Sequence, residues 1–191
     1  MNKNIVLCGV GGQGTVLASK LIAAAAMEKG LDVMSAETIG MAQRGGSVFS
    51  HVRMGDNIFT PMIAYKEADI IIAFEPAEAV RMLPYLKDGG KMIVSSRPVM
   101  PTTASLSDSN YNGSEMIEYL KKVLDEVVVI DTNKACEEIG STKVMNVLLL
   151  GAAVKTGVLG ITLDEIKDIV KKKVPEKFHE INFKALDYEI N

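Results

Sequence analysis

The residues best suited to chemistry form a glycine-rich segment near the N-terminus, which reads Cys8-Gly9-Val10-Gly11-Gly12-Gln13-Gly14. Between a strand and a helix, the spacing Gly-x-Gly-x-x-Gly is typical of phosphate-binding loops. Glycine lets the backbone turn sharply, so N–H groups can approach an anion, and the helix N-terminus adds partial positive charge. The candidate ligand-binding residues here are therefore Gly9, Gly11, Gly12, Gln13 and Gly14. The alternative is that the glycines only allow the helix to pack closely on the sheet.

Glu37 is a second candidate, because it ends the next expected strand. In dinucleotide-binding enzymes, an acidic residue about 20 residues after the glycine loop binds a ribose hydroxyl. This position predicts an NAD(P)-dependent oxidoreductase as one possible function. The alternative is that Glu37 merely opens a loop. The rest of the chain contains no recognisable acid/base pair or substrate-binding domain, which argues against a nicotinamide enzyme.

The segment 37–47 is a glycine-rich loop that carries a charge and an amide, and it leads into an expected strand. Alternation along that strand places Phe49, His51 and Arg53 on one face. One interpretation is that Arg44 and Arg53 form a clamp for a phosphate or carboxylate beside the glycine loop. The other interpretation is that these charges protect an exposed edge hairpin from aggregation.

The elements that must position these residues follow from the hydrophobic pattern. Runs of Ile and Val alternate with amphipathic segments, as expected for a mainly parallel sheet with helices on both faces. We predict a first βαβ unit from strands at 4–9 and 31–36 and a helix at 13–29. An antiparallel hairpin is predicted from strands at 47–54 and 58–63.

The second half continues the alternation. Further strands are predicted at 69–74, 91–95 and 127–131, and helices at 76–86, 114–125 and from about 133 onward. Residues 97–113 form a loop rich in Ser, Thr, Pro and Asn, which is either a mobile connection or a functional lid. The pattern predicts one three-layer α/β/α domain over residues 1–191, with a Rossmann-like sheet and a helical C-terminal region.

Composition excludes several function classes. The 191 residues are 48% hydrophobic and 24% charged with a formal net charge of −3, so a broad basic surface for nucleic acid is not expected. The N-terminus lacks the pattern of a signal peptide. The longest purely apolar stretch, 147–154, is far shorter than the ~18–20 residues of a membrane span. We therefore expect a cytoplasmic protein without a nucleic-acid or membrane partner.

Cysteine content limits cofactor chemistry. Cys8 and Cys136 are the only two cysteines, so neither a disulfide framework nor a four-thiolate iron–sulfur cluster is available in this chain. Cys8 is expected to be a small buried hydrophobe rather than a nucleophile. The spacing of the other residues indicates no metal site and no catalytic residue. The chain therefore lacks a complete catalytic apparatus of its own.

Several segments together resemble a known family. The sequence is similar to the small (beta) subunits of indolepyruvate:ferredoxin oxidoreductases, which correspond to the gamma subunit or domain of the wider 2-oxoacid:ferredoxin oxidoreductases. The segments that carry the resemblance are Gly9-Val10-Gly11-Gly12-Gln13-Gly14, Gly40-Met41-Ala42-Gln43-Arg44-Gly45-Gly46-Ser47-Val48, Ser50-His51-Val52-Arg53, Glu75-Pro76-x-Glu78-Ala79-x-Arg81-x-Leu83-Pro84, 146–152 and Asn182-Phe183-Lys184-Ala185. They cover most of the chain.

The resemblance implies an accessory subunit of an oxygen-sensitive enzyme that decarboxylates an arylpyruvate oxidatively. Coenzyme A accepts the acyl group as an aryl-acetyl thioester, and electrons pass to ferredoxin. In this family, thiamine diphosphate and the iron–sulfur clusters belong to the large partner subunit, so this chain is expected to be inactive alone. By position, the resemblance places the glycine loop at the cofactor cleft, with coenzyme A as a possible ligand and with further candidate residues Gln43, Arg44, Ser47 and Arg53 nearby.

A third possible function is that of a non-catalytic assembly scaffold. In that case the face with Phe49 and His51, or the methionine-rich surfaces, would serve only as protein interface. The isolated chain is a possible homodimer, because a face that is meant for a missing partner can self-associate.

Overall fold

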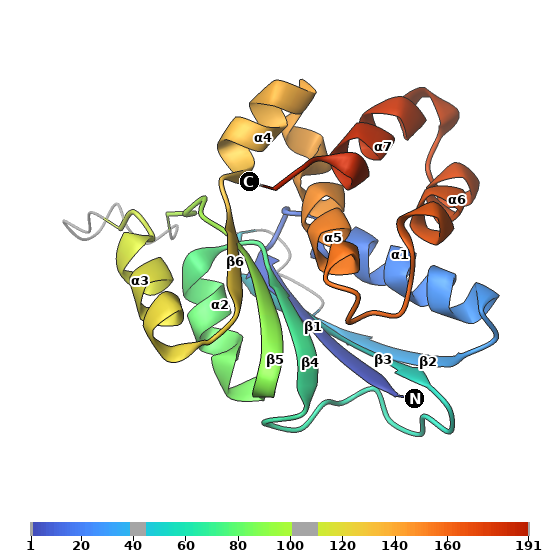
Figure 1. Cartoon of the computed structure of the whole chain (residues 1–191), viewed down its shortest axis with the longest axis horizontal. Coiled ribbons are helices and arrows are strands. Elements are labelled where there is room, and N and C mark those ends of the chain that lie inside the picture. The colour runs from blue at the N-terminus through green and yellow to red at the C-terminus, as the bar shows by residue number, and fades with distance from the viewer. Residues whose placement is uncertain (1, 39–44, 101–110, 191) are drawn as a thin grey trace.

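The computed structural model describes residues 2–38, 45–100 and 111–190. Six strands form one sheet in the order β2-β3-β1-β4-β5-β6 (Figure 1). Their bounds are β1 Lys3–Val10, β2 Asp32–Glu37, β3 Ser47–Gly55, β4 Ala68–Ala73, β5 Leu86–Ser95 and β6 Val127–Ile130. The α-helices of the described residues are α1 Thr15–Glu28, α2 Pro76–Met82, α3 Ser114–Val123, α4 Thr132–Ile139, α5 Met145–Lys155, α6 Leu163–Lys173 and α7 His179–Asp187.

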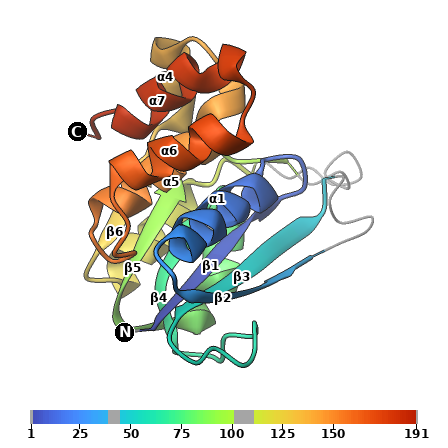
Figure 2. The same ribbon diagram turned by 90° about the vertical axis from the view of Figure 1, so that its right-hand side faces the viewer.

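Helices cover both faces of the sheet, as Figures 1 and 2 show, and the predicted α/β/α class is confirmed. On one face α2 packs on β1 and β4 and contacts α3, around a cluster that includes Val6, Ile71 and Met92. On the other face α1 packs on β2 and β3, and α5 packs on β4 and β5. The helices α4, α6 and α7 pack against this second group. The central strand β4 is buried along its whole length, as expected for a strand covered on both sides.

Strand β3 is antiparallel to both of its neighbours, β1 and β2. The other strand pairs are parallel: β1 with β4, β4 with β5, and β5 with β6. The predicted mainly parallel sheet with an antiparallel hairpin is thus confirmed, but the hairpin consists of β2 and β3. Residues 58–63 form no strand. Both edges of β3 are already paired, and Pro61 would remove a ladder hydrogen bond, so the second predicted hairpin strand is wrong.

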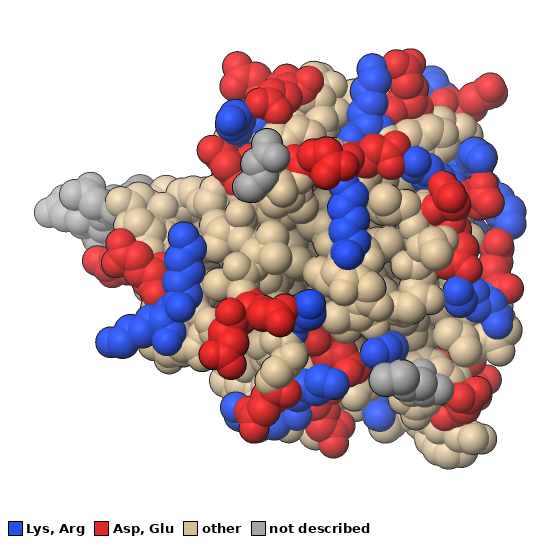
Figure 3. Space-filling model, in the orientation of Figure 1, with Lys and Arg blue, Asp and Glu red and all other residues tan. Residues whose placement is uncertain are grey.

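The surface charges are of mixed sign. On the face in Figure 3, Lys and Arg side chains alternate with Asp and Glu around the periphery, and the middle of this face is largely uncharged. Within the described part of the chain, no helix combines the length and the apolar character that crossing a membrane requires.

Candidate functional site

The glycine loop connects β1 to α1 at the carboxyl end of β1. Gly12 and Gly14 have φ angles of +102° and +86°, a region that favours glycine. A Cβ on Gly9 would lie 2.8 Å from the Cβ of Phe74, and one on Gly14 would lie 2.7 Å from Nδ2 of Asn146. Close packing therefore explains why positions 9 and 14 are glycine. At these two positions the alternative interpretation holds, that glycine allows the helix to pack closely on the sheet.

Gln13 bridges the loop and the neighbouring strand. Its Oε1 accepts from the N–H of Val10 at 2.6 Å, and its Nε2 donates to the carbonyl of Phe74 at 3.0 Å. The side chain thus links the end of β1 to the end of β4. These two adjacent strands continue into helices on opposite faces of the sheet, which is the arrangement where α/β proteins bind ligands. The side chain of Gln13 therefore helps to shape this crevice, with one hydrogen bond from its oxygen and one from its nitrogen already made inside the protein.

The start of β3 lies against the glycine loop. The N–H of Gly11 donates to the carbonyl of Gly46 at 2.8 Å, and the N–H of Gly45 donates back to the carbonyl of Gly11 at 3.2 Å. The hydroxyl of Ser47 donates to the buried carboxylate of Glu78 at 2.5 Å. Ser47 is therefore near the loop, as expected, but its hydroxyl serves to hold β3 in place.

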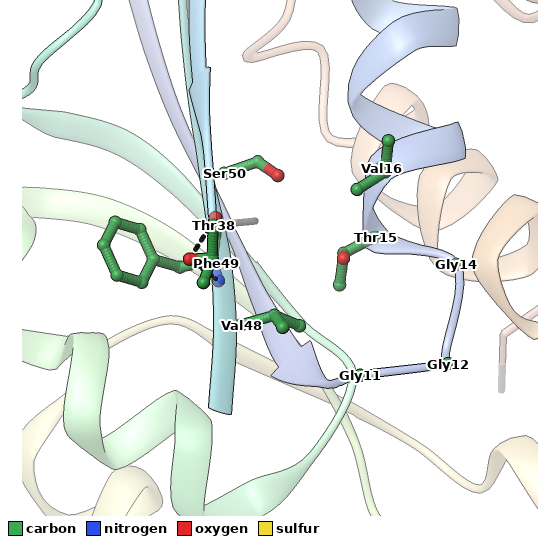
Figure 4. Close-up of a pocket in the computed structure, with 9 residues that line it drawn as sticks. All are labelled: Gly11, Gly12, Gly14, Thr15, Val16, Thr38, Val48, Phe49 and Ser50. Carbon is green, nitrogen blue, oxygen red and sulfur yellow. Dashed lines mark hydrogen bonds between the residues drawn. The ribbon is translucent and has the colours of Figure 1, made fainter. Parts of the chain in front are cut away.

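A pocket of about 330 Å³ lies on one side of the glycine loop. Figure 4 shows Thr15 and Val16 of α1 on one side of this pocket and Val48 and Ser50 of β3 on the other, while the ring of Phe49 points away. Ser50 is 1% exposed, and its hydroxyl has no hydrogen-bond partner among the described residues. An unpaired hydroxyl is costly to bury, so a ligand with a polar group would gain from reaching it.

A second pocket of about 450 Å³ lies on the other side of the same loop. It is lined by Gly12, Gln13 and Gly14 together with Arg97, which follows β5, and Lys143, which lies in the short 3-10 helix before α5. Both cationic side chains are exposed, and neither forms an ion pair within residues 2–38, 45–100 and 111–190. Two unpaired cations beside a glycine loop are suited to an anion.

The sequence-based candidates did not include Arg97, Lys143, Ser50 or Asn146 as ligand-site residues. Arg97 and Lys143 lie far from the glycine loop in the sequence, and only the fold brings them beside it. Asn146 begins one of the segments that carry the family resemblance, and its Nδ2 donates to the carbonyl of Gly14 at 3.4 Å. The family resemblance of segment 146–152 was therefore the one signal in the sequence that could have marked Asn146 as a site residue.

Arg53 does not lie beside the glycine loop. The β1–β3 register pairs Ser47 with Val10 at the loop, and Arg53 with Asn4 at the other end of the sheet. Arg53 lies six positions after Ser47 along β3, about 20 Å at the usual rise per residue. The expected clamp of Arg44 and Arg53 is therefore wrong for Arg53. Gln43 and Arg44 lie outside the described residues, so their role stays a prediction.

The other interpretation, that the charged residues of this strand protect an exposed edge hairpin from aggregation, is also wrong. His51 is completely buried in β3, between two paired strands. Its Nδ1 accepts from the N–H of Ile63 at 3.1 Å, and its ring packs against those of Phe49 and Tyr85. Burial lowers the pKa of His51 from its usual value of 6.5. The imidazole is thus held neutral as part of the core.

The position of Glu37 argues against dinucleotide binding. Strand β3 lies between β1 and β2, so Glu37 is one strand further from the glycine loop than in a typical dinucleotide-binding fold. Its Oε1 accepts from the hydroxyl of Ser19 in α1 at 2.9 Å. This contact ties β2 to α1.

Two buried glutamates lie at the carboxyl end of β4. Glu75 caps α2 by accepting from the N–H of Glu78 at 3.0 Å, and its other oxygen accepts from the hydroxyl of Tyr111 and from the N–H of Val99. Burial and the hydrogen bond to Glu75 raise the pKa of Tyr111. Glu75 therefore ties Val99 and Tyr111, which follow it by 24 and 36 residues in the sequence, to the end of β4. The loop predicted at 97–113 lies in part outside the described residues, at 101–110.

The cysteines do not fit an iron–sulfur cluster. Cys8 packs in the core on the α2 face of the sheet, and Cys136 packs in the core on the α5 face. Burial raises the pKa of Cys8 well above its usual value, and Glu78 and Glu75 raise it further. Neither thiol is a ready ligand. The described residues contain no group of three or more His, Cys, Asp or Glu side chains that could hold a metal.

Comparison with known proteins identifies the family. The profile of the pyruvate ferredoxin/flavodoxin oxidoreductase family matches residues 4–189. The chain belongs to this family. It is 36% identical over 189 residues to the indolepyruvate oxidoreductase subunit IorB of Pyrococcus horikoshii, covering 96% of this chain and 92% of that one. The resemblance inferred from the motifs is thus confirmed.

Solved structures of family members share the fold. A gamma subunit of keto/oxoacid ferredoxin oxidoreductase from Geobacter sulfurreducens is similar with a TM-score of 0.71 and 27% identity, over 97% of this chain and 93% of that one. A 2-oxoglutarate:ferredoxin oxidoreductase from Magnetococcus marinus, solved with 2-oxoglutarate, coenzyme A and succinyl-CoA bound, has a TM-score of 0.70 at 20% identity. This chain is covered to 97%, but only 30% of that longer polypeptide is matched, and at this identity the likeness concerns the fold alone.

Proposed function

We propose that this chain is the accessory subunit of a 2-oxoacid:ferredoxin oxidoreductase of the indolepyruvate type, with coenzyme A bound at its glycine loop. The family match over residues 4–189 and the identity to an IorB subunit support the subunit role. The large partner subunit carries thiamine diphosphate and the iron–sulfur clusters, in keeping with two separate, buried cysteines in this chain. The assembled enzyme converts an arylpyruvate to an aryl-acetyl-CoA and passes the electrons to ferredoxin. This chain is inactive alone.

The observation that carries the coenzyme A proposal is the pair of pockets that share the glycine loop. Arg97 and Lys143 give the larger pocket two unpaired cations for phosphate groups. The smaller pocket is largely apolar and offers the free hydroxyl of Ser50. Coenzyme A has both characters, because its phosphates are anionic and its pantetheine arm is neutral with amide groups. Gly12 and Gly14 line both pockets and connect them.

The remaining candidate residues from the sequence either hold the shape of the glycine loop or stay predicted ligand-binding residues, apart from Arg53. Gly9, Gln13 and Ser47 hold the shape of the loop through packing and internal hydrogen bonds. Gly11 is tied by its backbone to Gly45 and Gly46. Gln43 and Arg44 stay candidate ligand-binding residues, and Arg53 has no place in this site.

Titration calorimetry with coenzyme A tests the proposed site in the purified chain. We expect binding that the double variant Arg97→Gln, Lys143→Gln weakens at least about tenfold, since charge-assisted bonds to phosphate are lost. Lys122→Gln, an exposed lysine near the end of α3, is the matched control and should bind as the wild type. Equal affinity of the double variant and the wild type would refute the site.

The anaerobic complex tests the proposed reaction. We expect reduction of a low-potential dye by the assembled enzyme to depend on indolepyruvate and coenzyme A, with pyruvate and 2-oxoglutarate as poorer substrates. A nicotinamide oxidoreductase would instead bind NAD(P) in a direct titration. A pure scaffold would show assembly defects in the Arg97, Lys143 double variant without any change in the dependence on coenzyme A.

A further inference from the structure

The segment 56–66, between β3 and β4, presents apolar side chains to solvent at the end of the sheet opposite the glycine loop. Phe59 is 85% exposed, Tyr65 is 67% exposed and Met62 is 53% exposed. Aromatic residues and methionine are the types enriched in protein interfaces. Such a group within seven consecutive residues is far from the scatter of single exposed hydrophobes that a surface normally shows.

Side chains of β3 hold this segment from beneath. Nη1 of Arg53 donates to the carbonyls of Thr60 and Met62 at 3.4 Å and 3.3 Å, and Nε donates to Asn4 at 3.0 Å. The N–H of Ile63 donates to Nδ1 of the buried His51. These polar side chains of β3 therefore fix the backbone that carries the exposed residues. A fixed backbone lowers the entropy cost of binding.

The second anchor is at the C-terminal end of the segment. The N–H of Lys66 donates to the carbonyl of Pro84 at 3.0 Å. The ring of Tyr65 stands edge-on to that of Tyr85, with centroids 4.8 Å apart, and Tyr85 in turn packs on His51. The backbone is thus fixed directly after Phe59, at Met62 and Ile63, and again at Tyr65 and Lys66.

The exposed area suggests which partner covers the segment. Three large side chains exposed to this extent amount to roughly 400–500 Å² of surface. A stable interface takes about 800 Å² from each partner, so a two-fold pairing that uses only these three side chains and their copies falls short. A larger protein that contacts more of this molecule can use the segment as its central contact.

We propose that segment 56–66 is a docking surface for the large catalytic subunit, with Phe59 seated in an apolar pocket of that subunit. This inference rests on the proposed subunit role. Docking at segment 56–66 occupies the end of the sheet where β1 begins. It leaves the glycine loop, at the carboxyl end of β1, free for its own ligand. It also assigns Arg53 and His51, which the ligand site does not use, to the support of the interface.

Binding to the purified large subunit, measured by sedimentation velocity, tests the proposal. We expect Phe59→Ser to weaken assembly at least about tenfold, and the triple variant Phe59→Ser, Met62→Ser, Tyr65→Ser to abolish it. The matched controls are Phe178→Ser and Met27→Ser, at two other exposed apolar positions, which should assemble within about twofold of the wild type. Thermal unfolding of each isolated variant checks that it is folded.

The outcomes separate the docking surface from the coenzyme A site. Coenzyme A binding by the isolated triple variant should equal that of the wild type, since the two regions lie at opposite ends of the sheet. Loss of assembly in the triple variant supports docking, whether or not coenzyme A binds at the glycine loop. Wild-type assembly by the triple variant would overturn the proposal. So would a wild-type homodimer that the triple variant cannot form and that excludes the large subunit.

Discussion

Gln13 and Ser47 use their polar atoms to hold the glycine loop between β1, β3 and β4. Hydrogen bonds that are already made inside the protein are not available to a ligand without loss. Among the described residues, the groups that remain for a ligand include the hydroxyl of Ser50 and the cations of Arg97 and Lys143. At the scale of residues, the site therefore divides into side chains that shape the loop and side chains that face its pockets.

His51 makes the stability of the protein depend on pH. Burial lowers the pKa of folded His51 below its unfolded value of 6.5, so the unfolded chain takes up the proton first. The contribution of His51 is full above the unfolded pKa and is lost as the pH falls through 6.5 toward the folded pKa. We expect the free energy of unfolding from urea titrations to fall by up to about 1.4 kcal/mol per pH unit in this window.

The variant His51→Gln separates this effect from that of the carboxylates. Glutamine has a side-chain oxygen that can accept a hydrogen bond but does not titrate. The variant should therefore lack the wild type's extra loss of stability below pH 6.5. The same slope in both proteins would show that His51 does not cause it.

At the scale of elements, the length of the connection between β2 and β3 explains the mixed sheet. Residues 38–46 connect β2 to β3, fewer than the dozen or more residues that a parallel crossover needs. The chain must therefore return antiparallel, and β3 fills the place between β2 and β1. This insertion brings Gly46 to the glycine loop and carries Glu37 one strand away from it.

The junction of β4 and α2 provides a test at this scale. Glu75→Ala removes the cap of α2 together with the contacts to Tyr111 and Val99. We expect a loss of about 2–4 kcal/mol in the free energy of unfolding by urea, because a cap and charged hydrogen bonds are lost together.

Asp131→Ala is the matched control for Glu75→Ala. Asp131 caps α4 by accepting from the N–H of Lys134 at 3.1 Å, and losing a cap alone costs about 1 kcal/mol. Equal losses in the two variants would mean that the Tyr111 and Val99 contacts add nothing. Glu75→Gln keeps the acceptor oxygen that caps the helix and should recover part of the loss.

At the scale of the whole molecule, the two ends of the sheet have different surface chemistry. The glycine loop and the exposed cations Arg97 and Lys143 lie at the carboxyl end of β1. The exposed apolar segment 56–66 follows β3 at the other end, since β3 runs antiparallel to β1. One end is thus suited to an anionic ligand and the other to an apolar protein surface.

This division predicts that coenzyme A binding depends on salt and that assembly through segment 56–66 does not. Raising NaCl from about 50 mM to about 500 mM should weaken coenzyme A binding several-fold, because exposed charges are screened. The double variant Arg97→Gln, Lys143→Gln should show a smaller salt dependence of its affinity. Assembly through segment 56–66 should change little over the same range, as measured by sedimentation. Salt-independent binding of coenzyme A by the wild type would contradict a phosphate site at these cations.

The sequence by itself determined the class of fold and the family. Unbroken Ile and Val runs, such as Ile70-Ile71-Ile72, predict buried parallel strands because no polar alternation interrupts them. The glycine spacing identified the loop between β1 and α1, and two distant cysteines excluded a cluster in this chain. These inferences depend on local pattern or on composition, which a sequence contains in full. That residues 1–191 form a single domain stays a prediction.

Only the tertiary structure decided which residues share a site. Strand order placed β3 between β1 and β2, which separated Arg53 from the glycine loop and made His51 a core residue. The fold also brought Arg97 and Lys143 beside Gly12, although long stretches of sequence separate them. Periodicity shows which face of a strand a residue occupies, but not which strand lies next to it. Neighbours in space depend on long-range pairing and on the direction of each connection, and a local pattern does not encode either.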